Sequence, residues 1–208
     1  LELFRLGALV AADLDLLRVG GAHAARLADT SGETAHLCLF DGRDVVSIGR
    51  REMHRTGNEV TVIEREPPHC TSTGKVLLAA LPPEVLEATL HGWRLERKTP
   101  YTITDPRALR SGLEEVRHRG WAENIGESEL GAASIAAAIR DERGDVVAAL
   151  SIVGPVQRLG SDSLRRFARP VVDASLAVSR RLGYRDARTR LGTPVGKGPT
   201  STPTRGGS

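Results

Sequence analysis

Apolar residues near the start of the chain recur every three or four positions. This pattern covers residues 3–27 and is typical of amphipathic helices, and the neighbouring glycines Gly20 and Gly21 favour a break into two helices. From Thr34 the apolar period changes to two, and a turn at residues 41–42 separates two such runs. The region is therefore predicted to form two helices followed by a β-hairpin.

The middle of the chain carries start and stop signals for helices. Residues 59–63 could form a third strand, and a polar loop that ends in proline follows it. Residues 71–73 are all serine or threonine and can cap a helix, which a pair of prolines ends at residues 82–83 before a short helix. Asp105 and the proline after it begin a further helix, and Gly120 ends it.

The last third contains two runs that are almost wholly apolar. Residues 132–139 and 146–153 are predicted to be paired strands, buried on both faces and joined by a charged turn. A helical stripe follows from Ser161 to Gly183, and Pro170 is expected to kink that helix or to mark its first part as a separate turn. With helices between antiparallel strand pairs, the predicted fold is α+β.

Small residues dominate the segment from Gly120 to Pro155, which joins an acidic loop to the two apolar runs. Seven of its alanines, in the two apolar runs, leave space beside the backbone, while Asn124, Ser134 and Ser151 add a few polar groups. Small-ligand sites are usually lined in this way. The segment is therefore predicted to form the wall of a pocket.

Composition fits one domain. A chain of 208 residues can bury a sizeable core, and with only 3% aromatic residues that core must be packed by Leu, Val, Ile and Ala.

The apolar runs are too short to span a bilayer, and no secretory signal is visible. Cys38 and Cys70 lack a metal or redox spacing, which favours a reduced cytoplasmic compartment. Because the chain starts at Leu1 without an initiator, it is expected to be a fragment of a longer protein.

The basic pI of about 9.2 depends on the end of the chain. Residues 185–208 hold five basic residues against one acid, a net of +4, while the whole chain carries +3. The other 184 residues are therefore near −1, and such a body has no electrostatic footprint for nucleic acid. The segment is rich in Gly, Pro, Ser and Thr, which predicts a disordered basic tail.

The segment before Lys75 resembles the end of a phosphate loop. His69 stands where such a loop needs glycine, and Val76 stands where it needs Ser or Thr for magnesium, so a nucleotide site is not expected. Unpaired backbone N–H groups at the start of the following helix favour an anion. The alternative is that Ser72 or Thr73 merely caps the helix.

No motif for catalysis or metal binding is present in the sequence. The six histidines are scattered singly, and His54, His69 and Cys70 match no known ligand spacing, so neither a metal nor another cofactor is expected. Three carboxylates follow Gly120 and could act as an acid/base set, although such a turn is more typical of solvated acids: Glu123, Glu127 and Glu129.

Several short segments, in their order and spacing, resemble the C-terminal effector-binding domain of the IclR family of bacterial transcriptional regulators. The resemblance runs from about Phe4 to Tyr184. It depends on FRLG, TSTGKVLLAALP, TPYTITDPRALRSGLEEVRHRGWA, SIAAAIRD, GDVVAALSIVGP and RRLGY. It implies a GAF-like domain in which helices flank a curved antiparallel sheet of about six strands.

The resemblance also implies a division of the chain and a function. Residues 1–12 would be the remnant of an interdomain linker helix, residues 13–184 the effector-binding domain, and residues 185–208 the tail. The expected function is small-molecule sensing and oligomerisation, as a homodimer or homotetramer, for a cytoplasmic regulator of the repressor type. Operator DNA would be bound only through an N-terminal winged helix-turn-helix domain.

Relatives that bind small keto acids suggest the effector contacts. Those relatives use backbone N–H groups before a Gly-Lys pair, then an Asp, a Cys and two Ser. The corresponding positions here are Ser72, Thr73, Gly74, Asn124, Ser134, Ser151 and Val153. Asn and Val remove a charge and a hydroxyl group, so an effector larger or less polar than a keto acid is expected, from among small carboxylates, aromatic acids and polyols.

Two other functions remain open at this point. A small hydrolase could use Ser134 or Ser151 as nucleophile, although no base is evident beside either serine in the sequence. A GAF-like module could also hold an oligomer together without binding any ligand.

Overall fold

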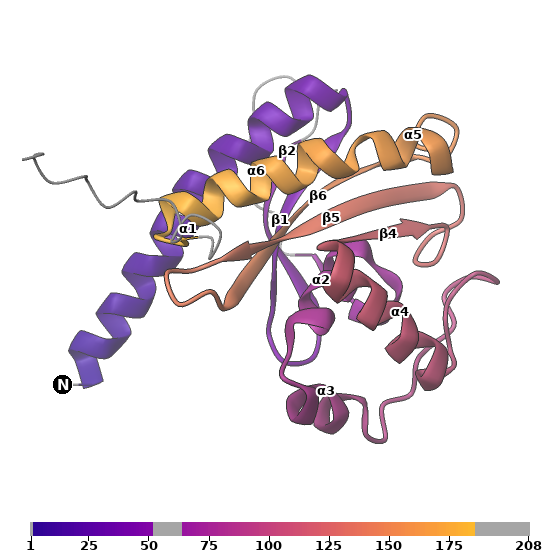
Figure 1. Ribbon diagram of the computed structural model, residues 1–208, viewed down its shortest axis with the longest axis horizontal. Coiled ribbons are helices and arrows are strands. Elements are labelled where there is room, and N and C mark those ends of the chain that lie inside the picture. The colour runs from indigo at the N-terminus through magenta and orange to yellow at the C-terminus, as the bar shows by residue number, and fades with distance from the viewer. Residues whose placement is uncertain (1, 52–63, 186–208) are drawn as a thin grey trace, which may run out of the picture.

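Six antiparallel strands form one curved sheet in the computed structural model, which describes residues 2–51 and 64–185 and the side chains from residue 15 onward (Figure 1). The strands are β1 (Thr34–Phe40), β2 (Val45–Arg51), β3 (Arg65–Glu66), β4 (Trp121–Ile125), β5 (Ala132–Arg140) and β6 (Val146–Pro155). Their order in the sheet is β3-β2-β1-β6-β5-β4. The predicted α+β class, hairpin and C-terminal strand pair are confirmed. The predicted strand at 59–63 and the tail after residue 185 lie outside the described residues.

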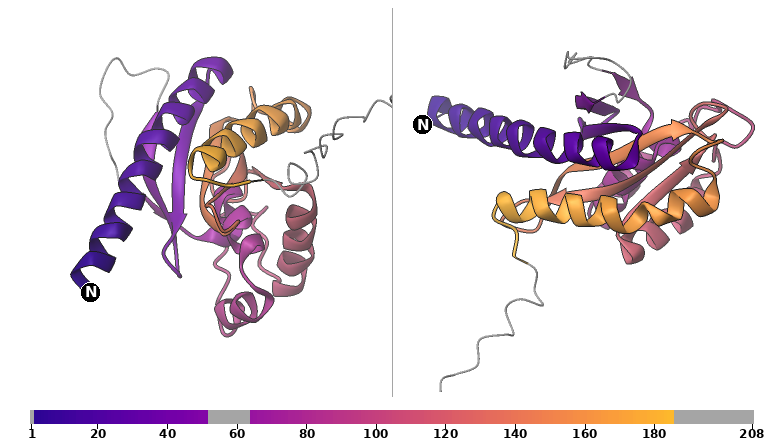
Figure 2. Two further views of the ribbon diagram at one scale, coloured as in Figure 1. Left: turned by 60° about the vertical axis from the view of Figure 1, so that its left-hand side comes forward. Right: turned by 90° about the horizontal axis from the view of Figure 1, so that it is seen from above.

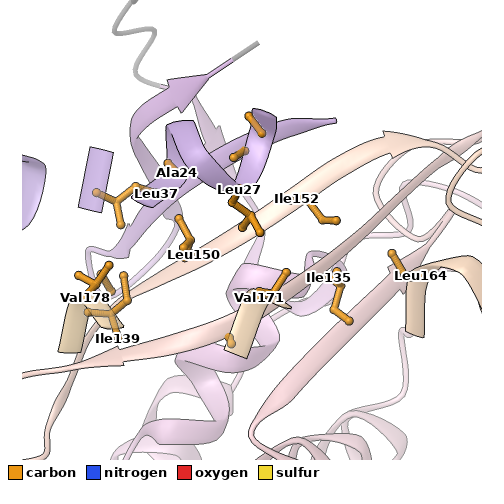
Figure 3. Packing of buried hydrophobic residues seen from close by; sticks show 14 of the residues in the cluster. Ala24, Leu27, Leu37, Ile135, Ile139, Leu150, Ile152, Leu164, Val171 and Val178 are labelled. Atoms are coloured by element: carbon orange, nitrogen blue, oxygen red, sulfur yellow. The ribbon is translucent and has the colours of Figure 1, made fainter. Parts of the chain in front are cut away.

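Helices cover both faces of the sheet (Figures 1 and 2). They are α1 (Glu2–Ser31), α2 (Ser72–Ala80), α3 (Pro83–Leu90), α4 (Pro106–Arg119), α5 (Ser161–Arg166) and α6 (Ala168–Arg181), with a 3-10 turn at Pro68–Cys70. One core lies between the sheet and the α1/α6 layer, and it includes Leu27, Ile135 and Leu150 (Figure 3). A second core lies on the opposite face, under α2, α3 and α4. Among residues 2–51 and 64–185, no helix combines the length and apolar character needed to cross a membrane.

The first helix is continuous, so the predicted break at Gly20 and Gly21 is wrong. A glycine costs a helix only about 1 kcal/mol, which packing can offset. A Cβ on Gly20 would lie 2.7 Å from the Leu37 side chain of β1. Gly20 therefore allows α1 to lie close against the sheet.

Local signals elsewhere specify the helix ends as predicted. Asp105 accepts hydrogen bonds from the N–H groups of Arg107 and Ala108, and Gly120 ends α4 with φ of +81°. Near the C-terminus the chain forms two helices, and Pro170 lies in the first turn of α6, where a missing N–H costs nothing. The sequence allowed either a kink at Pro170 or a separate first part of the predicted helix. The structure shows the second, because α5 is separate from α6.

Strand β4 occupies the segment for which the sequence predicts an acidic loop. Its five residues, WAENI, carry a glutamate that hides the alternation, but their burial does alternate, with Ala122 and Asn124 buried. The strand pairs with β5 along its whole length. This pairing places Asn124 on the sheet instead of in a loop.

A buried carboxylate ties the end of α1 to the segment after β6. Glu33 is 5% exposed and accepts hydrogen bonds of 2.7 and 2.8 Å from Arg158. A Cβ on Gly154 would lie 2.2 Å from the Glu33 carboxylate, so a larger residue there would displace that carboxylate. Since Gly154 directly follows Val153, the C-terminal end of α1 is anchored next to a predicted site residue.

Candidate ligand-binding site

A polar cavity of about 140 Å³ lies between the sheet and the first residues of α2. Six of the seven predicted site residues line it: Ser72, Thr73, Asn124, Ser134, Ser151 and Val153. They come from α2, β4, β5 and β6. Gly74 is not among the lining residues, and a Cβ there would lie 2.2 Å from the backbone of Pro68. Its role is therefore to let α2 pack against the preceding turn.

Strand register explains why the predicted residues converge. Asn124 is paired with Ser134 across β4 and β5, and Ser134 with Val153 across β5 and β6. Residues directly opposite each other share one face of a sheet, and Ser151 shares that face because it lies two positions from Val153. All four side chains therefore project from one face, toward α2.

The start of α2 supplies polar backbone groups to the same cavity. The Thr71 side chain caps the helix by accepting the N–H of Gly74, so Thr71 and not Ser72 or Thr73 is the cap. Among the described residues, no acceptor binds the N–H groups of Ser72 and Thr73. Because a helix N-terminus carries partial positive charge, these two groups can receive an anionic or carbonyl oxygen.

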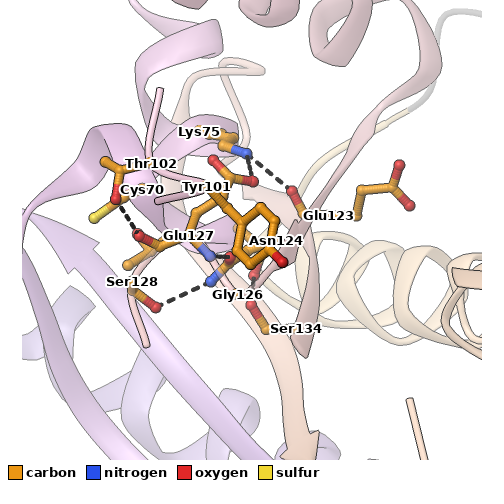
Figure 4. Close-up of polar contacts among 12 residues, drawn as sticks. Cys70, Lys75, Tyr101, Thr102, Glu123, Asn124, Gly126, Glu127, Ser128 and Ser134 are labelled. Atoms are coloured by element: carbon orange, nitrogen blue, oxygen red, sulfur yellow. Dashed lines mark hydrogen bonds and ion pairs between the residues drawn. The ribbon is translucent and has the colours of Figure 1, made fainter. Parts of the chain in front are cut away.

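Asn124 acts mainly on its own chain segment (Figure 4). Its Oδ1 accepts the N–H of Glu127 at 2.9 Å, and its Nδ2 donates to Ser128 Oγ at 3.1 Å. The Ser128 side chain also lines the cavity, although the sequence did not point to it. Asn124 therefore shapes the turn that brings Ser128 to the cavity, and only one of its amide hydrogens is left for a ligand.

Strands β1 and β2 and the segment at residues 64–66 add charged and titratable groups that were also not predicted. His36, Cys38, Arg50, Glu64 and Glu66 line the cavity, and Arg50 forms an ion pair of 2.6 Å with Glu64. The alternation of polar and apolar positions in β1 was a usable signal for the first two. Arg50 lies at the far end of β2, and Glu64 and Glu66 lie next to or within β3, where their neighbours depend on sheet pairing.

Burial keeps the titratable groups from β1 uncharged at neutral pH. It lowers the pKa of His36 to about 4, with a further contribution from the Arg50 charge, and raises the pKa of Cys38 to about 12. Partial burial and the nearby Glu64 also raise the pKa of Glu66. Neutral imidazole, thiol, hydroxyl and amide groups can bind a ligand by hydrogen bonds.

His36 and Ser151 are directly opposite each other on β1 and β6. Such a pair raises the question of a nucleophilic serine, because a histidine can act as its base. Within the part of the chain that the structure describes, no hydrogen bond joins the two side chains and no carboxylate is bonded to His36. The arrangement therefore lacks the oriented base that serine catalysis requires.

Lowering the pH from 7 to 5 is expected to reduce the free energy of unfolding by about 2 kcal/mol through His36. The unfolded chain takes up this proton near pH 6.5 and the folded chain only near pH 4, so stability falls as the pH falls through 6.5. A His36→Gln variant should lack this part of the decline, and denaturant unfolding at both pH values measures it. His91→Gln, at an exposed position, is the control. Equal declines in wild type and His36→Gln would contradict the assignment.

The three carboxylates interpreted as solvated differ in their environment. Glu129 is exposed, but the Glu127 side chain is only 12% exposed and forms an ion pair with Lys75. Lys75 Nζ also donates to the carbonyl of Glu123 at 3.1 Å. Burial raises the pKa of Glu127, although Lys75 opposes this effect. The solvated interpretation is therefore wrong for Glu127, which anchors the turn at residues 124–128 to α2.

His69 and Cys70 are buried packing residues. His69 Nε2 lies 3.0 Å from the carbonyl oxygen of Glu96, and its ring meets Trp93 edge-on. Within residues 2–51 and 64–185, no group of three His, Cys, Asp or Glu side chains is placed to hold a metal ion. His54, the third residue considered in the sequence, lies outside the described residues.

Comparison with known proteins gives a consistent family match. A family profile described as "Bacterial transcriptional regulator IclR C-terminal" matches residues 8–180. The HTH-type transcriptional repressor AllR of Klebsiella pneumoniae is 34% identical over 183 residues, which cover 88% of this chain and 67% of AllR.

Solved structures agree with the sequence match. The C-terminal domain of the E. coli transcriptional regulator KdgR superposes with a TM-score of 0.74 and 31% identity, covering 82% of this chain and 99% of that domain. The inducer-binding domain of the Acinetobacter transcription factor PobR, a double mutant in complex with 3-hydroxybenzoic acid, gives a TM-score of 0.71 and 28% identity. That alignment covers 78% of this chain and 96% of the PobR domain.

Proposed function

The chain belongs to the IclR family of bacterial transcriptional regulators, as their C-terminal domain, and from this we propose that its polar cavity binds the regulator's small-molecule effector. The observation that carries this proposal is that residues far apart in the sequence come together at one cavity. Six residues from four separate elements line a single cavity, and two of them, Ser72 and Thr73, have N–H groups that no acceptor binds among the described residues. Buried polar groups normally have hydrogen-bond partners, so a ligand that supplies them is favoured.

We infer that the effector is a small carboxylate that carries hydroxyl groups. A cavity of about 140 Å³ is small compared with the roughly 300 Å³ or more of pockets for drug-sized ligands, and six of its lining residues are serine or threonine. The lining does not favour the larger or less polar effector expected from the sequence. The N–H groups of Ser72 and Thr73 suit the carboxylate, and Ser128 and Ser151 suit the hydroxyl groups. The similar PobR domain was solved with 3-hydroxybenzoic acid, an aromatic acid that also combines a carboxylate with a hydroxyl group.

Ligand binding would act on the rest of the regulator through the cavity walls. A ligand that bridges the start of α2 and the turn at residues 124–128 would stabilise one packing of the effector domains over another. Such a ligand shifts DNA affinity only by its differential affinity for the two arrangements. Glu33 and Arg158 offer a route to α1, since their hydrogen bonds tie its C-terminal end to the segment after β6.

In the whole protein we propose a homodimer or homotetramer that binds operator DNA through a helix-turn-helix domain outside these 208 residues, in the cytoplasm. We also propose residues 1–12 as linker helix, 13–184 as effector domain and 185–208 as tail. Helix α1 passes residues 12–13 without interruption. The linker and the effector domain would thus share one rigid helix, which suits transmission between them.

We propose no enzymatic role for the serines of the cavity. The relatives are transcriptional regulators, and Ser134 accepts a hydrogen bond from Ser72 at 2.8 Å instead of facing a base. A nucleophilic serine needs a base within hydrogen-bond reach. Turnover of simple ester substrates by the purified domain would contradict this proposal.

Glycerate is expected to raise the melting temperature of the domain more than glycerol or propanoate does. Glycerol lacks the carboxylate and propanoate lacks the hydroxyl groups, so the three ligands separate the two requirements. Removing one hydroxyl group in Ser151→Ala should weaken glycerate binding about fivefold, since a hydrogen bond contributes about 1 kcal/mol. Thermal shift and calorimetry measure both effects.

Two further variants test the position of the site. Val153→Phe should fill the cavity and abolish binding, while Ser111→Ala, at an exposed position of α4, should bind like the wild type. If Val153→Phe kept the full ligand response, the effector would bind elsewhere. If none of the three ligands stabilised the wild type, the proposed effector class would be wrong.

A further inference from the structure

A second and larger cavity, of about 380 Å³, is lined by the C-terminal parts of α2 and α4, by the end of β5 and by α6. Its floor is apolar and includes Val76 and Ala79 of α2, Val116 of α4, Ala138 of β5, and Val172 and Leu176 of α6. It shares no lining residue with the polar cavity. Its volume lies in the range of about 300–1,000 Å³ that is usual for small-molecule sites.

This cavity exists because β4 is shorter than β5. Trp121, the first residue of β4, pairs with Ala137, so β5 continues to Arg140 without a neighbour on that side. The N–H of Arg140, which has no partner on β4, donates to Ser179 Oγ of α6 at 2.9 Å. At this uncovered end of β5 the small residues Ala137 and Ala138 line the cavity, and α4 and α6 flank it on opposite faces of the sheet (Figure 1).

Two arginines line this apolar cavity without a carboxylate partner among the described residues. Arg117 donates to the carbonyl groups of Ala79 and Leu81, at 2.8 and 3.3 Å, and Arg140 donates to the carbonyl of Gly144 at 2.8 Å. Carbonyl oxygens hold a guanidinium in place but leave its charge uncompensated. Each guanidinium has five donors in all, so donors remain for a further partner. Fixed, unneutralised guanidinium groups are suited to a carboxylate.

We propose that this cavity is a second ligand site and that it takes amphipathic monocarboxylates, with a ring or short alkyl chain on the apolar floor and the carboxylate at Arg117 and Arg140. The apolar floor supplies affinity through burial, and the two charges select an anion. The site is independent of the effector cavity and of its ligand.

Tyrosine fluorine NMR can locate the ligand, because the chain has only two tyrosines. Tyr184 lines the second cavity, whereas Tyr101 lies against Gly126, next to the turn that borders the polar cavity (Figure 4). In protein labelled with 3-fluorotyrosine, 4-phenylbutanoate should shift the Tyr184 resonance in a saturable manner and leave the Tyr101 resonance in place. The neutral 4-phenylbutanamide should bind about tenfold more weakly, because it lacks the charge-assisted hydrogen bonds.

Three variants complete the test. Arg140→Gln should weaken 4-phenylbutanoate binding about tenfold by removing one charged donor group. Ala80→Leu should abolish binding by filling the cavity, since Ala80 lines it from the exposed end of α2. Arg143→Gln, which removes an exposed arginine from the turn between β5 and β6, should change nothing.

Four results would overturn the proposal. The Tyr184 resonance could stay unmoved at saturating probe, or Ala80→Leu could respond like the wild type. The Tyr101 resonance alone could shift, which would place aromatic acids in the polar cavity. The Tyr184 resonance could instead change with protein concentration and not with probe, which would show that a second copy of the chain covers the cavity.

Discussion

A Gly74→Ala variant is expected to lose about 3 kcal/mol of its free energy of unfolding, toward the upper end of the usual cost of overpacking. The new Cβ would lie 2.2 Å from the Cα and the carbonyl oxygen of Pro68, which are backbone atoms that cannot rotate away. Relief would require α2 to move off the turn at Pro68–Cys70. Thermal unfolding should show a melting temperature lower by about 10 °C, given about 2–4 °C per kcal/mol for a domain of this size.

The same substitution at Gly112 is the matched control. Gly112 lies within α4, and a Cβ there meets nothing within 4 Å. Gly112→Ala should therefore raise stability by up to about 1 kcal/mol through helix propensity. Since the start of α2 borders the polar cavity, Gly74→Ala should also weaken effector binding. Equal stability of the two variants would contradict the close approach of α2 to Pro68.

A Lys75→Met variant is expected to lose about 3 kcal/mol at pH 7, because breaking a buried ion pair leaves the other charge unpaired. The Lys75 and Glu127 side chains are only 11% and 12% exposed, and Lys75 also holds the carbonyl of Glu123. Lys98→Met removes one partner of a much more exposed pair and should cost less than about 1 kcal/mol. Denaturant unfolding of both variants measures the difference.

The loss in Lys75→Met should depend on pH in a defined direction. Burial already raises the pKa of Glu127 above 4.5, and removing Lys75 removes the largest opposing influence. A carboxyl group whose pKa is higher in the folded than in the unfolded chain destabilises the folded state at every pH above its unfolded pKa. The stability lost in Lys75→Met should therefore be largest at pH 7 and should shrink as the pH falls toward 4.5. The double variant Lys75→Met/Glu127→Gln should recover most of the stability. A deficit that stayed constant with pH would mean that lost packing, not the unpaired carboxylate, is its cause.

The elements that the sequence predicted well have strong local signals. Helix α4 begins at an Asp-Pro pair and ends at Gly120, and strands β5 and β6 are long runs of apolar residues. The family resemblance, read from ordered short segments, is confirmed by the profile match over residues 8–180. Two local predictions failed. Contact with Leu37 outweighed the helix-breaking tendency of Gly20, and pairing with β5 makes a strand of a segment rich in acids.

The candidate site was also predicted only in part. Resemblance pointed to the residues from α2, β5 and β6 and to Asn124, and the structure brings six of the seven together, although their role in effector binding stays a prediction. The resemblance did not reveal that the Asn124 amide already forms hydrogen bonds with Glu127 and Ser128 in its own turn, nor that His36 lies opposite Ser151. Those facts depend on hydrogen-bond geometry and on strand order, which neighbouring residues in sequence do not encode.

The sequence by itself determined the fold class, the family, most helix ends and a pocket wall of small residues, because capping, periodicity and apolar runs act over a few neighbouring positions. The tertiary structure alone decided which side chains share the polar cavity, how burial shifts the pKa of His36, and where the short β4 leaves β5 uncovered between two arginines. These properties arise between residues far apart in the chain. Their physical causes are burial, strand register and close packing, which arise only when the sheet and the helices have packed together in the folded protein.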